Sequence, residues 1–256
     1  MPLVQSELKK RYIRVEAQPV TTAGIYHSPE QWLISLSSDW TNWITIADKN
    51  LGATQVYNNG DTLDEANCWK FYQRWNNYGF PYNWTFSSTT TRTDAGNYWP
   101  WNYYSSSTFI YRSSSPFNWD TSGNGDLWWW TTGTNEAMQW PCDSWFHVPT
   151  STELSNMTTI ISSLWLTLNW NTLKTYLLLP FAWQIVYNTW WYNNKWTIWV
   201  LWAANAYSAT DWYRMYFDSS DIYHISIYKT NWQSVRPFKN ISVQPDETRT
   251  ALYPTN

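Results

Sequence analysis

The sequence predicts an α+β fold with a twisted antiparallel sheet, about two helices and long irregular loops. Apolar residues recur at helical spacing over 150–164, and four short segments between 197 and 238 have the apolar or alternating pattern of strands. Residues 79–126 are rich in Ser, Thr, Asn, Tyr and Pro, which predicts a long, loop-dominated region. The chain of 256 residues is long enough to bury a substantial core, and one domain is its simplest division.

The clearest predicted element is the helix over 150–164. It begins with a capping box, in which Thr150 and Glu153 satisfy each other's backbone N–H groups, and its apolar face contains Leu154, Met157, Ile160, Ile161 and Leu164. A second helix is predicted over 63–75, because its first turn is acidic and aromatic residues follow inside it.

The other predicted elements are strands. Ile44 and Ile46 belong to a strand that enters a turn within 40–56, and 175–182 has the composition of a buried strand interrupted by Pro180. Further strands are predicted at 197–202, at 213–217 and 222–228 around a turn at 218–221, and at 234–238, where the sheet closes. We expect an extended lead-in over 1–24, the domain over 25–240 and a tail or linker over 241–256.

The chain contains 24 tryptophans but only 8 glycines. Average usage near 7% would give roughly 18 glycines in a chain of this length. Many of the tryptophans follow residues that favour turns, at positions where glycine is the usual next residue: Trp40, Trp43, Trp84, Trp119, Trp145, Trp170, Trp212 and Trp232. Trp165 directly follows the predicted helix, where a left-handed cap favours glycine.

We therefore hypothesise that many tryptophans represent UGA codons, in an organism that reads UGA as glycine. The hypothesis predicts positive φ at Trp40, Trp43, Trp145 and Trp232, and UGG codons at 40, 43 and 145 would contradict it. The alternative is a true tryptophan-rich surface for sugars or membranes, but an interfacial helix places tryptophan on one face, and these positions have no period. The tryptophans in apolar runs are expected to be genuine: Trp99, Trp128 and Trp199.

Charge and hydropathy exclude several classes of partner. With 16 basic and 19 acidic residues, the net charge of −3 gives no basic surface for nucleic acid. Charged residues make up only 14% of the chain, so the surface must be built from uncharged polar residues. No stretch of eighteen apolar residues predicts a membrane span, and no apolar segment after the first basic residues predicts a signal peptide.

The remaining chemical groups give weak predictions. Cys68 and Cys142 are a disulfide candidate, with two separate buried thiols as the alternative. Asp120, Asn124 and Asp126 resemble half of a calcium loop, but the twelfth position is Thr131, so a polar turn explains them better.

Catalytic motifs are not visible in the sequence. The three histidines, His27, His147 and His224, lack ligand spacing; we expect a backbone hydrogen bond for His147 and a structural ion pair or hydrogen bonds to carbonyls for Arg236. The sequence contains no nucleophile elbow, phosphate-binding loop or dinucleotide motif. We therefore expect no enzymatic activity and no cofactor.

Several blocks of sequence resemble one domain family. WPCDSWFHVPTSTEL (140–154), ITIADKNLGA (44–53), YQRWNNYGFPY (72–82), LPFAW (179–183), and the pair YRMYF and SVRPF (213–217, 234–238) are similar to motifs of the Fibrobacter succinogenes major paralogous domain. The similarity increases when tryptophan is replaced by glycine at Trp145 and Trp183.

The resemblance implies a C-type-lectin-like domain that is extracellular or exposed at a cell surface. It implies a ligand-binding or adhesion module without catalytic activity, because the related formylglycine-generating enzymes need reactive cysteines elsewhere. Such domains also serve as variable proteins of diversity-generating retroelements. We expect a glycan or protein ligand to bind the 199–232 face through Trp199, Asn205, Tyr207, Asp211, Tyr213, Tyr223, His224 and Tyr228. The alternative is a structural repeat or stalk module without a specific ligand; the oligomeric state stays open.

Overall fold

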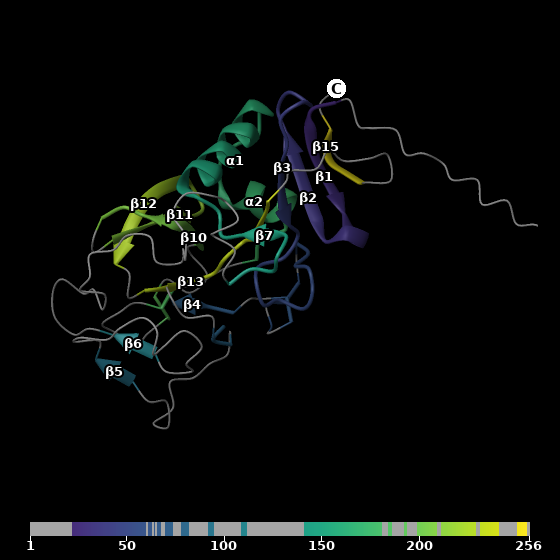
Figure 1. Cartoon of the computed structure of the whole chain (residues 1–256). Coiled ribbons are helices and arrows are strands. Elements are labelled where there is room, and N and C mark those ends of the chain that lie inside the picture. The colour runs from purple at the N-terminus through teal and green to yellow at the C-terminus, as the bar shows by residue number, and fades with distance from the viewer. Residues whose placement is uncertain are drawn as a thin grey trace, which may run out of the picture.

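The computed structural model describes most of the predicted domain. The residues described are 22–59, 61–62, 64, 66–67, 70–73, 78–81, 92–94, 109–111, 141–180, 184–185, 192–193, 199–208, 211–228, 231–240 and 250–254. They form two α-helices and several antiparallel sheets, so the predicted α+β class is confirmed. In Figure 1 strands β1 to β3 lie on the right, β10 to β12 lie on the left, and α1 and α2 lie between them.

The largest sheet has six strands in the order β15-β1-β2-β3-β14-β7. These strands are Thr250–Pro254, Gly24–Ser28, Leu33–Ser37, Ile44–Ala47, Phe238–Lys239 and Phe146–His147. A short 3-10 helix, η1 (Pro29–Gln31), connects β1 to β2. The strand predicted around Ile44 is confirmed, because Ile44–Ala47 forms β3. Residues 250–254 were expected in a tail, but their pairing with β1 makes them part of this sheet.

A second sheet has the order β10-β11-β12, and its strands are Trp199–Ala206, Asp211–Phe217 and Ile222–Tyr228. The predicted hairpin is confirmed, because β11 and β12 pair in unbroken register from Asp211↔Tyr228 to Phe217↔Ile222. Asp218 closes its turn by accepting from the N–H groups of Ser220 (2.8 Å) and Asp221 (3.0 Å).

Two smaller sheets complete the described strands. One has the order β4-β13-β8-β9, with strands Tyr72–Gln73, Trp232–Gln233, Gln184–Ile185 and Tyr192–Asn193. The other is a parallel pair, β5 (Arg92–Asp94) and β6 (Phe109–Tyr111). Both β5 and β6 come from the region predicted to be dominated by loops.

Helix α1 (Ser151–Ser163) forms as the capping box predicts. The Thr150 hydroxyl accepts from the Glu153 N–H at 3.1 Å, and the Glu153 carboxylate accepts from the Thr150 N–H at 2.8 Å. Its buried residues include Leu154, Met157 and Ile161, which face the core.

The predicted strand at 175–182 is wrong, because helix α2 (Trp170–Tyr176) occupies its beginning. Asn169 caps this helix by accepting from the Thr172 N–H at 3.1 Å, a signal that the adjacent leucine run obscured. Residues 177–180 follow as buried irregular backbone, and 181–182 lie outside the described residues.

The helix predicted over 63–75 is also wrong where the structure describes it. Asp64 accepts from the N–H groups of Ala66 (2.9 Å) and Asn67 (3.0 Å), which favours a turn over a helix. After the turn, Phe71 pairs with Phe80, and Tyr72–Gln73 joins the sheet as β4.

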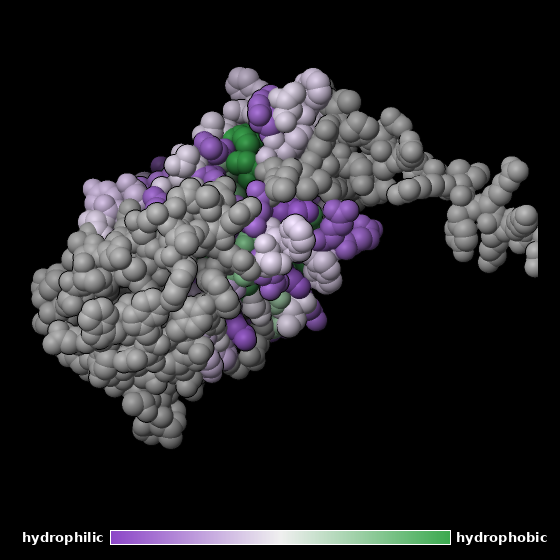
Figure 2. Space-filling model, in the orientation of Figure 1, coloured by the Kyte–Doolittle hydropathy of each residue, from purple (hydrophilic) through white to green (hydrophobic). Residues whose placement is uncertain are grey.

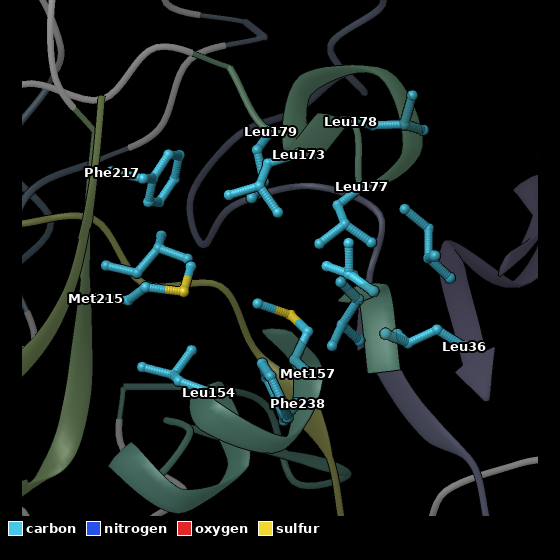
Figure 3. Close-up of a cluster of buried hydrophobic side chains, with 14 of the residues drawn as sticks. Leu36, Leu154, Met157, Leu173, Leu177, Leu178, Leu179, Met215, Phe217 and Phe238 are labelled. Atoms are coloured by element: carbon cyan, nitrogen blue, oxygen red, sulfur yellow. The ribbon is translucent and has the colours of Figure 1, made fainter. Parts of the chain in front are cut away.

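The main core lies where the helices meet the two large sheets. Figure 3 shows side chains from α1, α2, β2, β11 and β14 pointing toward one another. This cluster includes Leu36, Leu154, Met157, Leu173, Leu177, Leu179, Met215, Phe217 and Phe238. At roughly 1.5–3 kcal/mol for each fully buried side chain, it is the principal stabilising element of the described fold.

The segment 234–238 was predicted to close the hairpin sheet, but it instead connects separate parts of the fold. The Trp202 N–H donates to the Ser234 carbonyl (3.0 Å), and the Ala47 N–H donates to the Pro237 carbonyl (2.9 Å). Between them, the buried Arg236 donates to the carbonyls of Ala47 (2.8 Å) and Leu178 (3.1 Å), as expected for a structural arginine. Burial lowers the pKa of Arg236 to about 9, and Asp48 acts in the opposite direction, so the guanidinium stays charged at neutral pH.

Three tryptophans have left-handed backbone: Trp32 (φ 58°), Trp40 (φ 57°) and Trp165 (φ 63°). Trp40 agrees with the expectation, and Trp165 occupies the predicted helix cap. Among the described residues, Trp43, Trp145 and Trp232 do not have positive φ, so that expectation is wrong for these three. Trp43 is instead buried, and its indole N–H donates to the Trp40 carbonyl at 2.8 Å.

Trp165 ends α1 in a Schellman motif. Its N–H donates to the Ser162 carbonyl at 2.9 Å, and the Leu166 N–H donates to the Ile161 carbonyl at 3.3 Å. The motif requires a left-handed residue at position 165, where glycine has no steric penalty. The indole is 92% exposed and therefore contributes little packing to offset that penalty.

We predict that Trp165→Gly raises the free energy of unfolding by about 1 kcal/mol, because a left-handed residue with a Cβ atom costs roughly that amount. Urea denaturation measures the change. Trp165→Ala is the matched control, since it removes the indole but keeps the Cβ atom. An equal gain from both variants would contradict the backbone explanation.

Candidate functional site

The sheet β10-β11-β12 carries the predicted site, and strand alternation divides its residues between two faces. The inner face packs on α1 and contains Trp199, Leu201, Met215 and Phe217. The outer face contains Trp202, Trp212 and Arg214, with Tyr216, Tyr223 and Ile225 toward its open edge. Residues directly opposite each other in an antiparallel pair share a face, so the register fixes this division.

Trp199 cannot present its ring to an external ligand in this structure. It is 1% exposed and packs edge-on against Phe217, with 4.8 Å between ring centroids. Its burial agrees with a genuine indole in the core. It does not suit the predicted role as a contact residue.

The outer face has a patch on β11 and β12, which we call the outer patch and define as the partly exposed Tyr216 and the exposed Tyr223 and Ile225. Tyr223 is 42% exposed and Ile225 is 38% exposed. The rings of Tyr216 and Tyr223 lie 5.9 Å apart, and the Arg214 guanidinium lies 5.3 Å from the Tyr216 ring centroid. Burial lowers the pKa of Arg214 to about 10, while Tyr216 acts in the opposite direction.

A second exposed aromatic group lies at the β10–β11 turn. Tyr207 is 60% exposed and meets Tyr213 edge-to-face, with 5.2 Å between ring centroids. The turn beneath it is closed by Asp211, whose backbone carbonyl accepts from the Tyr207 and Ser208 N–H groups, both at 3.1 Å. The Asp211 carboxylate accepts from the Ser208 hydroxyl at 3.0 Å. Asp211 therefore shapes the turn that presents Tyr207.

Two other predicted residues contact α1. The Asn205 side chain accepts from the Ser151 N–H (2.8 Å) and donates to the Ser151 hydroxyl (2.9 Å), which fixes the helix start. His224 lies on the inner face, with Nε2 3.3 Å from the Thr158 hydroxyl, and burial lowers its pKa.

The eight predicted residues therefore do not form one surface. Tyr228 pairs with Asp211 at the other end of the hairpin and is partly buried. Tyr216 was missed as a site residue, because Tyr213, Met215 and Phe217 determined the expected core face. Its position opposite Tyr223 in the hairpin is the signal that would have identified it.

His147 and Glu153 form a polar cluster with Asn240 at the start of α1. His147 Nε2 lies 2.9 Å from Glu153 Oε1, and Nδ1 lies 3.0 Å from the Asn240 side-chain oxygen. His147 was expected to bond to the backbone, but its partners are side chains. Burial acts to raise the pKa of Glu153, but His147 and the Thr150 hydrogen bonds outweigh it, so the pKa is lowered.

The cysteine and metal predictions have separate outcomes. Cys142 is a free, buried thiol, so the predicted disulfide is wrong for this structure; Cys68 lies outside the described residues. Burial raises the pKa of the Cys142 thiol, and the nearby Asp143 adds to the effect. The calcium-loop candidates Asp120, Asn124 and Asp126 also lie outside the described residues. Among the residues that are described, no group of three or more His, Cys, Asp or Glu side chains could hold a metal ion.

Comparisons with family models, curated proteins and solved structures find no match to this chain. No helix in the described part of the chain is long and apolar enough to span a membrane. The described surface visible in Figure 2 is mostly hydrophilic or neutral, with strongly apolar colour limited to small areas.

We predict that acid weakens the fold through Glu153. Because its pKa in the folded state is lowered from 4.5, its contribution is complete above that value and is lost as the pH falls through the folded-state pKa. Glu153→Gln should therefore reduce the acid-dependent fall in unfolding free energy, measured by urea denaturation from about pH 6 to pH 3. Glu30→Gln, which removes an exposed glutamate from η1, is the control and should retain the fall. Equal slopes for Glu153→Gln and the unmodified chain would contradict the prediction.

Proposed function

We propose that this protein is a non-enzymatic ligand-binding or adhesion module of a cell or particle surface. The ligand is a glycan or a protein, and it contacts the 199–232 face through Tyr207 and the outer patch. The observation that supports this proposal is the exposure of Tyr207 (60%), Tyr223 (42%) and Ile225 (38%) on a sheet whose β10 and β11 tryptophans are buried. These large side chains form no part of the described core and are available for contact.

The sheet supports these side chains rigidly. Trp202 is fully buried, and its indole N–H donates to the Tyr72 carbonyl at 3.1 Å; Trp212 is also buried and donates to the Ala203 carbonyl. Tyrosines on a fixed backbone give a large contact area and a polar hydroxyl while losing little conformational entropy on binding. Exposed aromatic rings beside uncharged polar groups suit either a sugar or a protein surface.

The proposal includes the C-type-lectin-like architecture and an extracellular or surface location. Both rest on the family resemblance, and the uncharged polar composition agrees with them. The same resemblance suggests diversification by a retroelement. Tyr207, Tyr223, His224 and Ile225 are exposed, whereas the neighbouring Arg214 and Met215 are buried, so the frame can be retained while the exposed positions vary. A reverse-transcriptase gene with a template repeat beside this gene would support this part of the proposal.

A stalk or repeat module without a specific ligand is the second candidate. The structural roles of Asn205 and Asp211, together with the burial of Trp199, favour it, because these predicted contact residues serve the fold. The two candidates differ in whether the exposed tyrosines bind anything.

We predict that Tyr207→Ala combined with Tyr223→Ala weakens ligand binding at least about tenfold, as truncation of interface aromatic anchors commonly does. Binding is measured first on an array of neutral and acidic glycans and an array of cell-surface protein domains, then by titration of the strongest ligand found. Thr159→Ala, on the exposed side of α1, is the control and should bind normally. Absence of binding by the unmodified protein on both arrays would favour the stalk. Equal binding by the double variant would contradict the role proposed for Tyr207 and the outer patch, because the ligand would then bind elsewhere.

A further inference from the structure

A pocket of 410 Å³ lies away from the 199–232 face, beside strands β2, β3 and β7. The turn after η1, the loop that follows β3 and the segment before β7 surround it. Its lining includes Trp32, Lys49, Asn50, Gly52, Asp143 and Phe146. The volume falls within the range of about 300–1,000 Å³ typical of small-molecule sites.

Asn50 is the unusual group in this pocket. It is 2% exposed, yet neither its side-chain oxygen nor its side-chain nitrogen has a hydrogen-bond partner in the structure. A buried amide without partners costs free energy, so such a group requires an explanation, and an ordered water or a ligand is one. An amide offers one acceptor and two donor hydrogens, so it suits a ligand that can both donate and accept.

The backbone holds Asn50 in place. Its carbonyl accepts from the Ala53 N–H at 3.1 Å, and the adjacent Leu51 N–H donates to the Val235 carbonyl at 2.9 Å. Gly52 completes this turn with φ 84°, where a Cβ atom would lie 2.8 Å from the Lys70 side chain. The backbone that carries this amide is therefore a fixed turn beside the pocket.

The pocket lining contains one basic and one acidic side chain. Lys49 and Asp143 both line it, and the Lys49 ammonium lies 4.0 Å from the centroid of the Trp32 ring. One positive and one negative group give no preference for a net charge on the ligand. Phe146, Leu51 and Pro237 provide apolar wall. The lining thus combines a residue whose buried amide has no partner, balanced charges and apolar surface.

We propose that this pocket binds one neutral sugar residue, either free or at the end of a glycan chain. Each sugar hydroxyl both donates and accepts, so two adjacent hydroxyls satisfy the Asn50 amide once its side chain turns toward the pocket, while the C–H face of the ring contacts the apolar wall. The site shares no residue with the outer patch and does not depend on the function proposed for that patch.

The test is Asn50→Leu, which keeps the side-chain volume nearly constant and removes the amide. Binding is measured by saturation-transfer NMR with methyl glycosides of neutral hexoses and N-acetylhexosamines, and by calorimetry with oligosaccharides that end in the sugar bound best. We expect Asn50→Leu to weaken binding at least about tenfold. We also expect its Tm to be unchanged or higher, because an unpartnered buried amide is lost.

Two results would overturn this proposal: binding of the sugar by Asn50→Leu at unchanged affinity, or no binding of any methyl glycoside or oligosaccharide by the unmodified protein. A clearly lower Tm of Asn50→Leu would also count against it, because the amide would then have a partner in the fold. Binding of oligosaccharides but not methyl glycosides would assign the site to glycan ends. Thr159→Ala, on the exposed side of α1 and outside the pocket lining, is the control and should bind these sugars normally.

An independent observation concerns the residues with left-handed backbone. Trp32, Trp40 and Trp165 are 49%, 51% and 92% exposed, so none of the three indoles is anchored in the core. Each occupies a specific turn: Trp32 ends η1, Trp165 ends α1, and Trp40 follows Asp39, which accepts from the Thr41 and Asn42 N–H groups. Positive φ is rare for bulky residues and ordinary for glycine.

We infer that residues 32, 40 and 165 of the natural chain are glycine, encoded by UGA. Trp202 is the contrasting case, because its ring is fully buried and its N–H group is bonded. We expect UGA at codons 32, 40 and 165, UGG at codon 202, and peptides from the natural protein with the mass of glycine at the three turn positions. UGG at codons 32, 40 and 165, or tryptophan masses in those peptides, would overturn the inference.

Residue 32 belongs both to the pocket lining and to the positions inferred to be glycine. Glycine there would remove the indole beneath Lys49 and widen the mouth of the pocket, but would leave the Asn50 amide in place. Trp32→Gly should therefore still bind the same methyl glycosides, and complete loss of their binding would contradict the role assigned to Asn50.

Discussion

The buried guanidinium of Arg236 is the interaction on which the arrangement of the described fold depends. A charge taken out of water must keep its hydrogen bonds, and Arg236 finds them on Ala47 in β3 and on Leu178 after α2. Its neighbours in 234–238 bond to β10 and to the loop after β3. One short segment thus holds the large sheet, the hairpin sheet and the second helix together, although it contributes little regular structure of its own.

This connection explains why the 199–232 face can present tyrosines. Both faces of β10 are buried, by α1 on one side and by Val148, Val235 and Tyr72 on the other, so β10 acts as an internal support. Exposure increases toward β12, where the outer patch lies, and at the turn that carries Tyr207. Side chains at these positions can change without disturbing the buried support, which is the property that a recognition surface requires.

The sequence predicted best where the signal was local. The capping box of α1 and the alternating arms of the hairpin depend on residues a few positions apart, and both predictions are confirmed. The leucines of 177–179 resembled a strand, because a short apolar run has the composition of a buried strand even where, as here, the backbone after a helix is irregular. The candidate site could be predicted only in part, because alternation sends Tyr223 and His224 to opposite faces. The unpartnered amide of Asn50 depends on tertiary packing, which no local pattern in the sequence reveals.

The pairing of the first and last described strands has a mechanical consequence. Gly24 in β1 is the register partner of Pro254 in β15, so the outer ends of these antiparallel strands lie side by side (Figure 1). Tension applied at Gly24 and Pro254 acts along the hydrogen bonds between β1 and β15, so these bonds break one pair after another from that end. Strand β15 would separate from β1 before the leucine core and the tyrosine-bearing sheet are disturbed. Under the function proposed above, such a module would lengthen under load before the sheet that carries its tyrosines is disturbed.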